Sequence, residues 1–259
     1  NMIAIKVMDK QYRTVAIARG DEEVSLVLYR TYEEGDFIFI EMTETEGFLQ
    51  IQYDDAMGSA LQSVKKMTSF KIPFNELKAS YSPKAFSGEV HLITARYAKD
   101  YEIRAYRNLA LNPYDFEANR TAFPHASSDS GATGVFAARN AIDGIRVNQS
   151  HNEWPYCSWG INKNPDSKLK IDFGHEADID KITLYIRFDM PHDNYWEQIN
   201  VNFSDGEPLT MPLEMTDKPQ TLAFETRRTT FVELSNMVAA KRPSLFPALS
   251  QIEIYGNAI

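Results

Sequence analysis

The stretch Ala248-Leu-Ser-Gln-Ile-Glu-Ile-Tyr-Gly256 lies near the end of the chain and indicates how the rest is built. Its residues Ile252 and Ile254 alternate with polar ones, which is the period of a β-strand with one buried face. Comparable β-branched or aromatic runs precede it at 169–173, 182–186, 199–203, 222–224 and 231–234. An earlier series of the same kind occupies 3–7, 24–29, 37–40, 48–53 and 90–94. The sequence therefore predicts an all-β protein.

The two strand series predict two β-sandwich domains, because many short strands with turn residues between them are typical of sandwiches and barrels. The segment from Asn108 to Ser130 separates the series and shows no clear hydrophobic period. We place the boundary around Ala105–Arg107, which gives an N-terminal sandwich of unknown role at 1–105 and a second domain at 106–259. Each part is long enough for a hydrophobic core of its own.

Charge and composition exclude several classes of function. The chain has 27 Lys and Arg against 36 Asp and Glu, a net charge of −9, which argues against binding nucleic acid or an anionic membrane surface. No apolar run approaches the ~20 residues of a membrane span, so we expect no membrane insertion. Cys157 is the only cysteine, which excludes an intrachain disulfide and a multi-cysteine metal site.

The start of the chain gives an expectation about location. If Met2, which follows Asn1, is the natural first residue, we expect a cytoplasmic protein. Otherwise we expect a secreted or cell-surface protein.

Sequence signatures of enzymes are mostly absent. The chain has no Gly-x-Ser-x-Gly elbow, no phosphate loop and no His-Glu-x-x-His motif. A nucleophile at Cys157 would need a histidine base, and no local signature supports one. Asp189 and Asp193 could form an acid–base pair, but loop carboxylates more often bind sugar hydroxyls or cap turns. We therefore predict a protein that is not an enzyme.

Six fragments of the second half resemble one family when taken in order. They are Asn108-Leu-Ala110, Ala141-Ile-Asp-Gly144, Leu169-Lys-Ile-Asp-Phe-Gly174, Ser204-Asp-Gly206, Thr230-Phe-Val-Glu-Leu234 and the closing stretch 248–256. Together they resemble the discoidin, or coagulation factor V/VIII type C, family over residues ~107–259. A subset of bacterial putative carbohydrate-binding proteins is more similar still, on the segments Ser158-Trp-Gly-Ile-Asn162 and Pro191-His-Asp-Asn-Tyr-Trp196. The resemblance implies a galactose-binding-like jelly roll that binds carbohydrate without catalysis. Residues 1–104 resemble no family that we can name.

The resemblance also implies a structural calcium ion, for which one ligand position has changed. Its implied ligands are the backbone carbonyl of Asn140, the carboxylate of Asp143 and the side chain of Gln251, with Asn148 or Ser150 completing the set. Gln251 stands where the family has Glu. A neutral carbonyl in place of a carboxylate weakens a site for a hard cation such as Ca²⁺.

Two loops have the residue types that bind sugars. The apolar face of a sugar ring packs on Trp or Tyr, and its hydroxyls need directed partners such as Asp, Asn, Arg or His. Loops 152–156 and 187–196 contain both kinds, and we expect them to converge at one end of the sandwich. The candidate ligand-binding residues are Trp154, Tyr156, Arg187, Asp189, His192, Asp193, Tyr195 and Trp196.

Other interpretations of the same residues stay open. Trp154, Tyr195 and Trp196 could instead be buried plugs under the loops, and His192 could be a turn residue. Trp159 stands where the family has a core-facing Trp. The leading prediction is non-catalytic binding of a mono- or oligosaccharide. The alternatives are a protein-interaction module on the same fold or a glycan-processing enzyme, which would need two carboxyl groups roughly 5–9 Å apart in one cleft.

Overall fold

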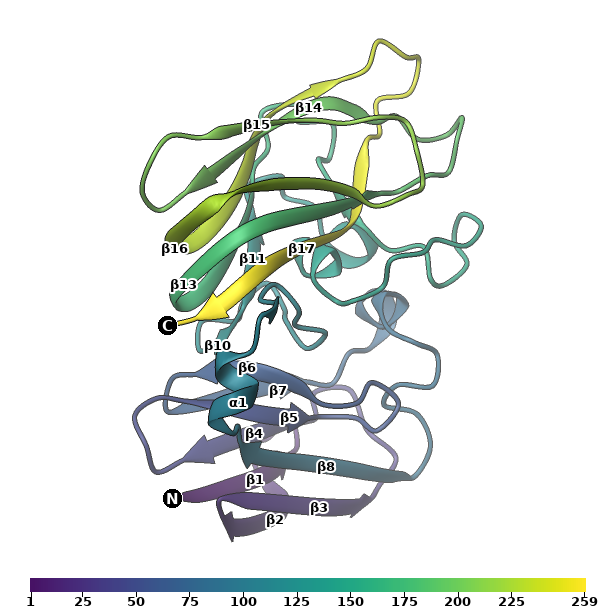
Figure 1. Cartoon of the computed structure of the whole chain (residues 1–259). Helices are drawn as coiled ribbons and strands as arrows, with labels where there is room; N and C mark the ends of the chain where they lie inside the picture. The colour runs from purple at the N-terminus through teal and green to yellow at the C-terminus, as the bar shows by residue number, and fades with distance from the viewer. The chain divides into compact units, whose positions relative to one another are not determined.

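The computed structural model describes all of residues 1–259, and its regular structure is almost entirely β (Figure 1). The helical segments are α1 (Asp100–Arg104) and three 3₁₀ turns, η1 (Asn75–Ser80), η2 (Gly134–Phe136) and η3 (Ala138–Ala141). No helix has the length and apolar character needed to cross a membrane. The predicted all-β class is confirmed, because the helical segments are short and few.

The chain divides into two compact units. The N-terminal unit contains residues 1–103 together with 120–123, and the C-terminal unit contains 104–119 and 124–259. Residues 120–123 belong to the first unit because β10 (Ala122–Phe123) pairs with β6 (Ala60–Val64). The chain therefore returns to the first unit after the boundary near Ala105–Arg107, which the sequence pattern does not indicate. Independent folding of the two parts stays a prediction.

The N-terminal unit consists of two antiparallel sheets. One has the order β2-β1-β4-β7 and the other β10-β6-β5-β8-β3. Their remaining strands are β1 (Met2–Met8), β2 (Thr14–Asp21), β3 (Glu23–Tyr29), β4 (Phe37–Met42), β5 (Gly47–Gln52), β7 (Met67–Lys71) and β8 (Val90–Tyr97). Alternate residues such as Ile38 and Ile40 are fully buried. Phe70 of one sheet stacks on Tyr53, which follows β5 of the other, with ring centroids 5.1 Å apart, so the sheets pack face to face.

The C-terminal unit is built on long strands that bend. Its strands are β9 (Arg107–Asn108), β11 (His125–Ser128), β12 (Trp159–Gly160), β13 (Leu169–Ile186), β14 (Trp196–Phe203), β15 (Leu209–Pro212), β16 (Gln220–Ala239) and β17 (Ala248–Ala258). Figure 1 shows β13 and β16 side by side along much of their length. The predicted strands 169–173 and 182–186 are the two halves of β13, and 222–224 and 231–234 both lie in β16.

The two halves of β13 lie in different layers of a sandwich. Residues 169–172 pair with β11 and with 231–234 of β16, whereas residues 177–186 pair with β17 and with earlier residues of β16. The register shifts between Asp172 and Ala177, where Gly174 has a φ of +73°. Strands that change layers at such bulges are a known way to close a sandwich. The predicted C-terminal β-sandwich is therefore confirmed, with the antiparallel layers expected of a jelly roll.

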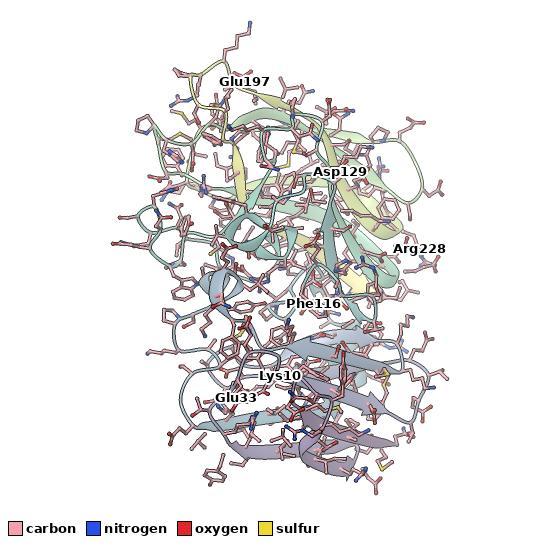
Figure 2. All side chains as sticks on the ribbon, turned by 180° about the vertical axis from the view of Figure 1, so that it is seen from behind. Lys10, Glu33, Phe116, Asp129, Glu197 and Arg228 are labelled. Carbon is pink, nitrogen blue, oxygen red and sulfur yellow. The ribbon has the colours of Figure 1, made fainter.

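Side chains fill the space between the two layers (Figure 2). Trp159 of β12 and Trp196 of β14 are almost fully buried and stack there with ring centroids 6.0 Å apart. At the surface, Arg228 of β16 points away from the sheet and pairs with Asp178 of β13 at 2.9 Å. Position 256 of β17 requires glycine. A Cβ there would lie 2.1 Å from the backbone oxygen of Asp178.

Candidate functional site

A cavity of about 460 Å³ lies among the loops of the C-terminal unit. Loop 151–156, the segment after β12, the loop between β13 and β14 and the segment before β17 all contribute to its lining. The residues from these segments that matter below are His151, Tyr156, Lys163, Arg187, His192 and Phe246. The two loops chosen from the sequence therefore meet at one cavity.

The guanidinium group of Arg187 is held in the wall of the cavity by Asp193. Its Nε donates to Asp193 Oδ2 at 2.9 Å, and a second nitrogen donates to Oδ1. A third contact runs to Ser158 Oγ at 3.3 Å. Both members of the ion pair are buried, and Asp193 Oδ2 also accepts the backbone N–H of Asp189 at 3.0 Å. The pair therefore fixes the conformation of the loop, and its polar atoms are largely occupied by each other.

A row of side chains in contact borders the cavity, and we call it the cavity row. Its members in order are Lys163, Phe246, His192, His151 and Tyr156. Lys163 Nζ lies 5.7 Å from the ring centroid of Phe246, and the His192 ring stacks on Phe246 at 5.8 Å. The rings of His192 and His151 are 4.8 Å apart, and His151 is 5.4 Å from Tyr156. The row places cationic and N–H donor groups beside exposed ring surface.

Tyr156 is the buried end of the cavity row. Its hydroxyl donates to Asn152 Oδ1 at 3.3 Å, and burial raises the pKa of the phenol. The neutral phenol is therefore the form present at physiological pH. Tyr156 can supply ring surface and a hydroxyl to the cavity but no charge.

Phe246 and its neighbour Leu245 were missed by the sequence analysis. They are 42% and 63% exposed, which is unusual for large apolar side chains beside a cavity. The signal was present in Ser244-Leu-Phe-Pro247, where two large apolar residues stand in a turn just before the closing strand. Lys163 and His151 were missed as well, and each lies in a polar loop that has no distinctive pattern.

The structure separates the eight predicted ligand-binding residues into groups. Tyr156, Arg187 and His192 line the cavity. Trp154, Asp189 and Tyr195 are half-buried and do not line it. Asp193 is fully buried against Arg187.

The prediction that Trp196 offers a surface for a ligand is wrong. The side chain is 1% exposed and belongs to the hydrophobic core. Strand β14 begins at Trp196 itself, so this residue faces the core as the first member of the strand rather than the last member of a loop. The expected core position of Trp159 is confirmed, since it is 0% exposed.

The residues implied for a calcium ion form a closed group, which we call the Gln251 cluster: Asn140, Asp143, Gly144 and Gln251. Gln251 Nε2 donates to the backbone oxygen of Asn140 at 2.7 Å and to Asp143 Oδ1 at 2.5 Å. Its Oε1 accepts the N–H of Gly144 at 2.9 Å. With the amide turned over, its carbonyl oxygen would face the oxygens of Asn140 and Asp143, so the neighbours fix its orientation.

As arranged, these residues do not fit a calcium ion. The Gln251 amide nitrogen, which cannot ligate a cation, points at the two oxygens that would bind one. Asn148 Oδ1 accepts the backbone N–H of Phe188 at 3.3 Å instead of joining the group. Burial raises the pKa of Asp143 to about 7, although Arg139 acts in the opposite direction. No cluster of three or more His, Cys, Asp or Glu side chains suited to a metal occurs in the chain.

Comparisons with known proteins place this chain in no family. A scan against protein families finds no match, and neither does a search of the curated proteins.

Three solved structures similar to this chain are distant likenesses. The lectin domain of lectinolysin complexed with Lewis b antigen is 18% identical, with a TM-score of 0.44, and the match covers 58% of this chain and 97% of that one. The family 32 carbohydrate-binding module of Clostridium perfringens NanJ in complex with galactose is 16% identical, with a TM-score of 0.39 and coverage of 50% and 91%. A Streptococcus pneumoniae fucose-binding module is 14% identical, with a TM-score of 0.41 and coverage of 59% and 96%. Likenesses this distant leave the ligand of this chain to be argued from the cavity itself.

Proposed function

We propose that the protein binds carbohydrate without catalysis, through the cavity of the C-terminal unit. The observation that carries the proposal is the exposed residue Phe246, whose ring contacts both Lys163 and His192. A saccharide has an apolar C–H face and many hydroxyl groups, so it needs ring surface and directed polar partners together. The cavity row supplies both on loops that a rigid sandwich holds in place.

The cavity favours binding over glycoside hydrolysis. Hydrolysis by the usual route needs two carboxyl groups on either side of the scissile bond. No Asp or Glu lines the cavity, and the nearby Asp193 is already paired with Arg187. The discoidin-like resemblance in residues ~107–259 points to binding as well, and membership of that family remains part of the proposal.

A second candidate function is binding of a protein partner. The adjacent side chains of Leu245 and Phe246 expose apolar surface that a protein could bury. An aliphatic side chain such as Leu245 is a poor stacking partner for a sugar, because it offers no flat ring. Leu245→Ala therefore distinguishes the two functions: it should leave affinity for a saccharide within about twofold but weaken a protein complex.

The test is a glycan array followed by calorimetric titration of the strongest ligand. Phe246→Ala should weaken binding about tenfold or more, since an aromatic contact contributes about 0.5–1.5 kcal/mol beyond its buried area. Tyr29→Ala is the matched control, because Tyr29 is an aromatic residue of the N-terminal unit that is 80% exposed. Failure of the array to show any ligand, or equal binding by Phe246→Ala and Tyr29→Ala, would overturn the proposal.

A further inference from the structure

The cavity differs in charge from the chain as a whole. Acidic residues outnumber basic ones by 36 to 27. The cavity lining reverses this balance, since it contains Lys163, Arg187, His151 and His192 but no Asp or Glu. The acidic residues Glu153, Asp166 and Asp189 lie on the same loops without lining the cavity. A ligand in the cavity therefore meets cations and N–H donors in the lining, and the nearby carboxylate of Asp193 is already paired with Arg187.

Lys163 carries a positive charge that no carboxylate of the protein balances. The charge of Arg187 is balanced by Asp193, to which it is bound through two nitrogens. Lys163 is exposed and forms no ion pair, and its one described contact is with the ring of Phe246 at 5.7 Å. An ammonium group has three donors and no acceptor. Lys163 is therefore available to bind an anionic group next to that ring.

The two imidazoles add further donors beside Phe246. The ring nitrogens of His192 and His151 form no hydrogen bond to another group of the protein. A neutral imidazole has one N–H donor, and a protonated one has two. The ring centroids of His192 and His151 lie 4.8 Å apart, so one ligand group can contact both rings.

We propose that the saccharide bound at the cavity row carries an acidic group, a carboxylate or a sulfate. This inference rests on the proposed function and specifies its ligand. Lys163 and His192 both contact Phe246, so the donors for an anion border the ring surface that would pack on the sugar. In a uronic acid or a sulfated sugar the anionic group is only one to three bonds from the ring, so it can reach a donor that borders that ring surface.

The test compares matched neutral and acidic sugars on the whole chain. The probes are D-galactose against D-galacturonic acid and galactose 6-sulfate, and D-glucose against D-glucuronic acid, each titrated by calorimetry at low and high NaCl. The variants are Lys163→Gln and Lys218→Gln. Lys218 is a matched control because its side chain is 79% exposed and lies outside the cavity lining.

The expected result has three parts. At least one acidic sugar binds about tenfold more tightly than its neutral counterpart, as a charge-assisted hydrogen bond requires. Lys163→Gln removes that preference and Lys218→Gln preserves it. High salt weakens binding of the acidic sugar and leaves binding of the neutral sugar unchanged.

Three other results would overturn the inference, and they differ in what they say about the proposed function. If the unmodified chain binds acidic and neutral sugars equally well, the proposal of carbohydrate binding is kept and the proposal of an acidic ligand is wrong. A preference that survives Lys163→Gln shows that the anion binds elsewhere. Binding of no neutral or acidic glycan in the array removes both proposals.

Discussion

The Gln251 cluster and the cavity row both contain polar side chains, but they differ in how many of their polar groups have partners within the protein. In the Gln251 cluster, the amide nitrogen and oxygen both have partners within the chain, at 2.5–2.9 Å. In the cavity row, Lys163 has no ion pair and the imidazoles have no hydrogen-bond partner. A buried polar group costs free energy unless it has a hydrogen-bond partner. The paired groups of the Gln251 cluster therefore hold the loops in place. The exposed, unpaired groups of the cavity row are free to bind a ligand.

The Arg187–Asp193 pair should show the largest effect on stability. Asp193→Ala leaves a buried guanidinium group without its partner, which costs about 3–5 kcal/mol. The double variant Arg187→Met with Asp193→Leu should lose less than either single variant, because no buried charge remains. Urea unfolding followed by tryptophan fluorescence measures this, since Trp154, Trp159 and Trp196 are the only tryptophans and all lie in the C-terminal unit. An unchanged unfolding midpoint in Asp193→Ala would mean that the pair does not anchor the loop.

Changes in the Gln251 cluster should have an intermediate effect on stability. They also test whether the cluster needs a bound cation. Gln251→Ala removes the donor to Asn140 and Asp143 and should cost about 1–3 kcal/mol. The unmodified chain should melt at the same temperature with a chelator or with millimolar Ca²⁺. Gln251→Glu brings two carboxylates together, so it should be destabilised in the chelator and recover in Ca²⁺.

The Gln251→Ala variant is the control for that recovery, because it has no new ligand and should not respond to Ca²⁺. A rise in melting temperature when Ca²⁺ is added to the unmodified chain would contradict the arrangement of the Gln251 cluster. It would show that a cation, and not the amide, joins the loop to β17.

The smallest effect is expected at a satisfied carboxylate that water can still reach. Hydrogen bonds from Arg96 hold the pKa of Glu102 at about 2, well below its usual 4.5, with help from the backbone N–H of Lys99. This interaction therefore stabilises the N-terminal unit above pH 4.5 and is lost as the pH falls through about 2.

Glu102→Gln should cost about 1 kcal/mol or less near neutral pH, because the pair is partly exposed to water. The difference from the unmodified chain should shrink as the pH falls towards 2. Hydrogen exchange in peptides from residues 1–103 measures it, since no tryptophan lies there. A difference that does not change with pH would show that Glu102 acts through packing rather than charge.

Most of the strands were predictable from the sequence because their signal is local. Alternation of Ile252 and Ile254 with polar residues is visible within a few positions and corresponds to β17. Strand β2, whose residues are all exposed or half-buried, gives no such contrast and was not predicted. The sequence also did not predict that two of the expected strands join into β13. Gly174 between them is compatible both with a turn that ends a strand and with a bend inside one.

The candidate site was predictable only as a set of loops. Polar loop residues look alike in sequence whether they bind each other, as Arg187 and Asp193 do, or face a cavity, as His192 does. Trp196 was misplaced because strand β14 starts three residues before the apolar run at Ile199 that marked it. The role of Gln251 depends on a partner 108 positions away, which no local pattern contains.

The long strands β13 and β16 have a consequence for how the C-terminal unit unfolds. Each runs through both layers of the sandwich, so neither layer can lose its hydrogen bonds without disturbing strands that the other layer shares. We expect the two layers to melt together in one cooperative step. No loop around the cavity lies within β13 or β16, so the loop sequences can change while that cooperativity is kept.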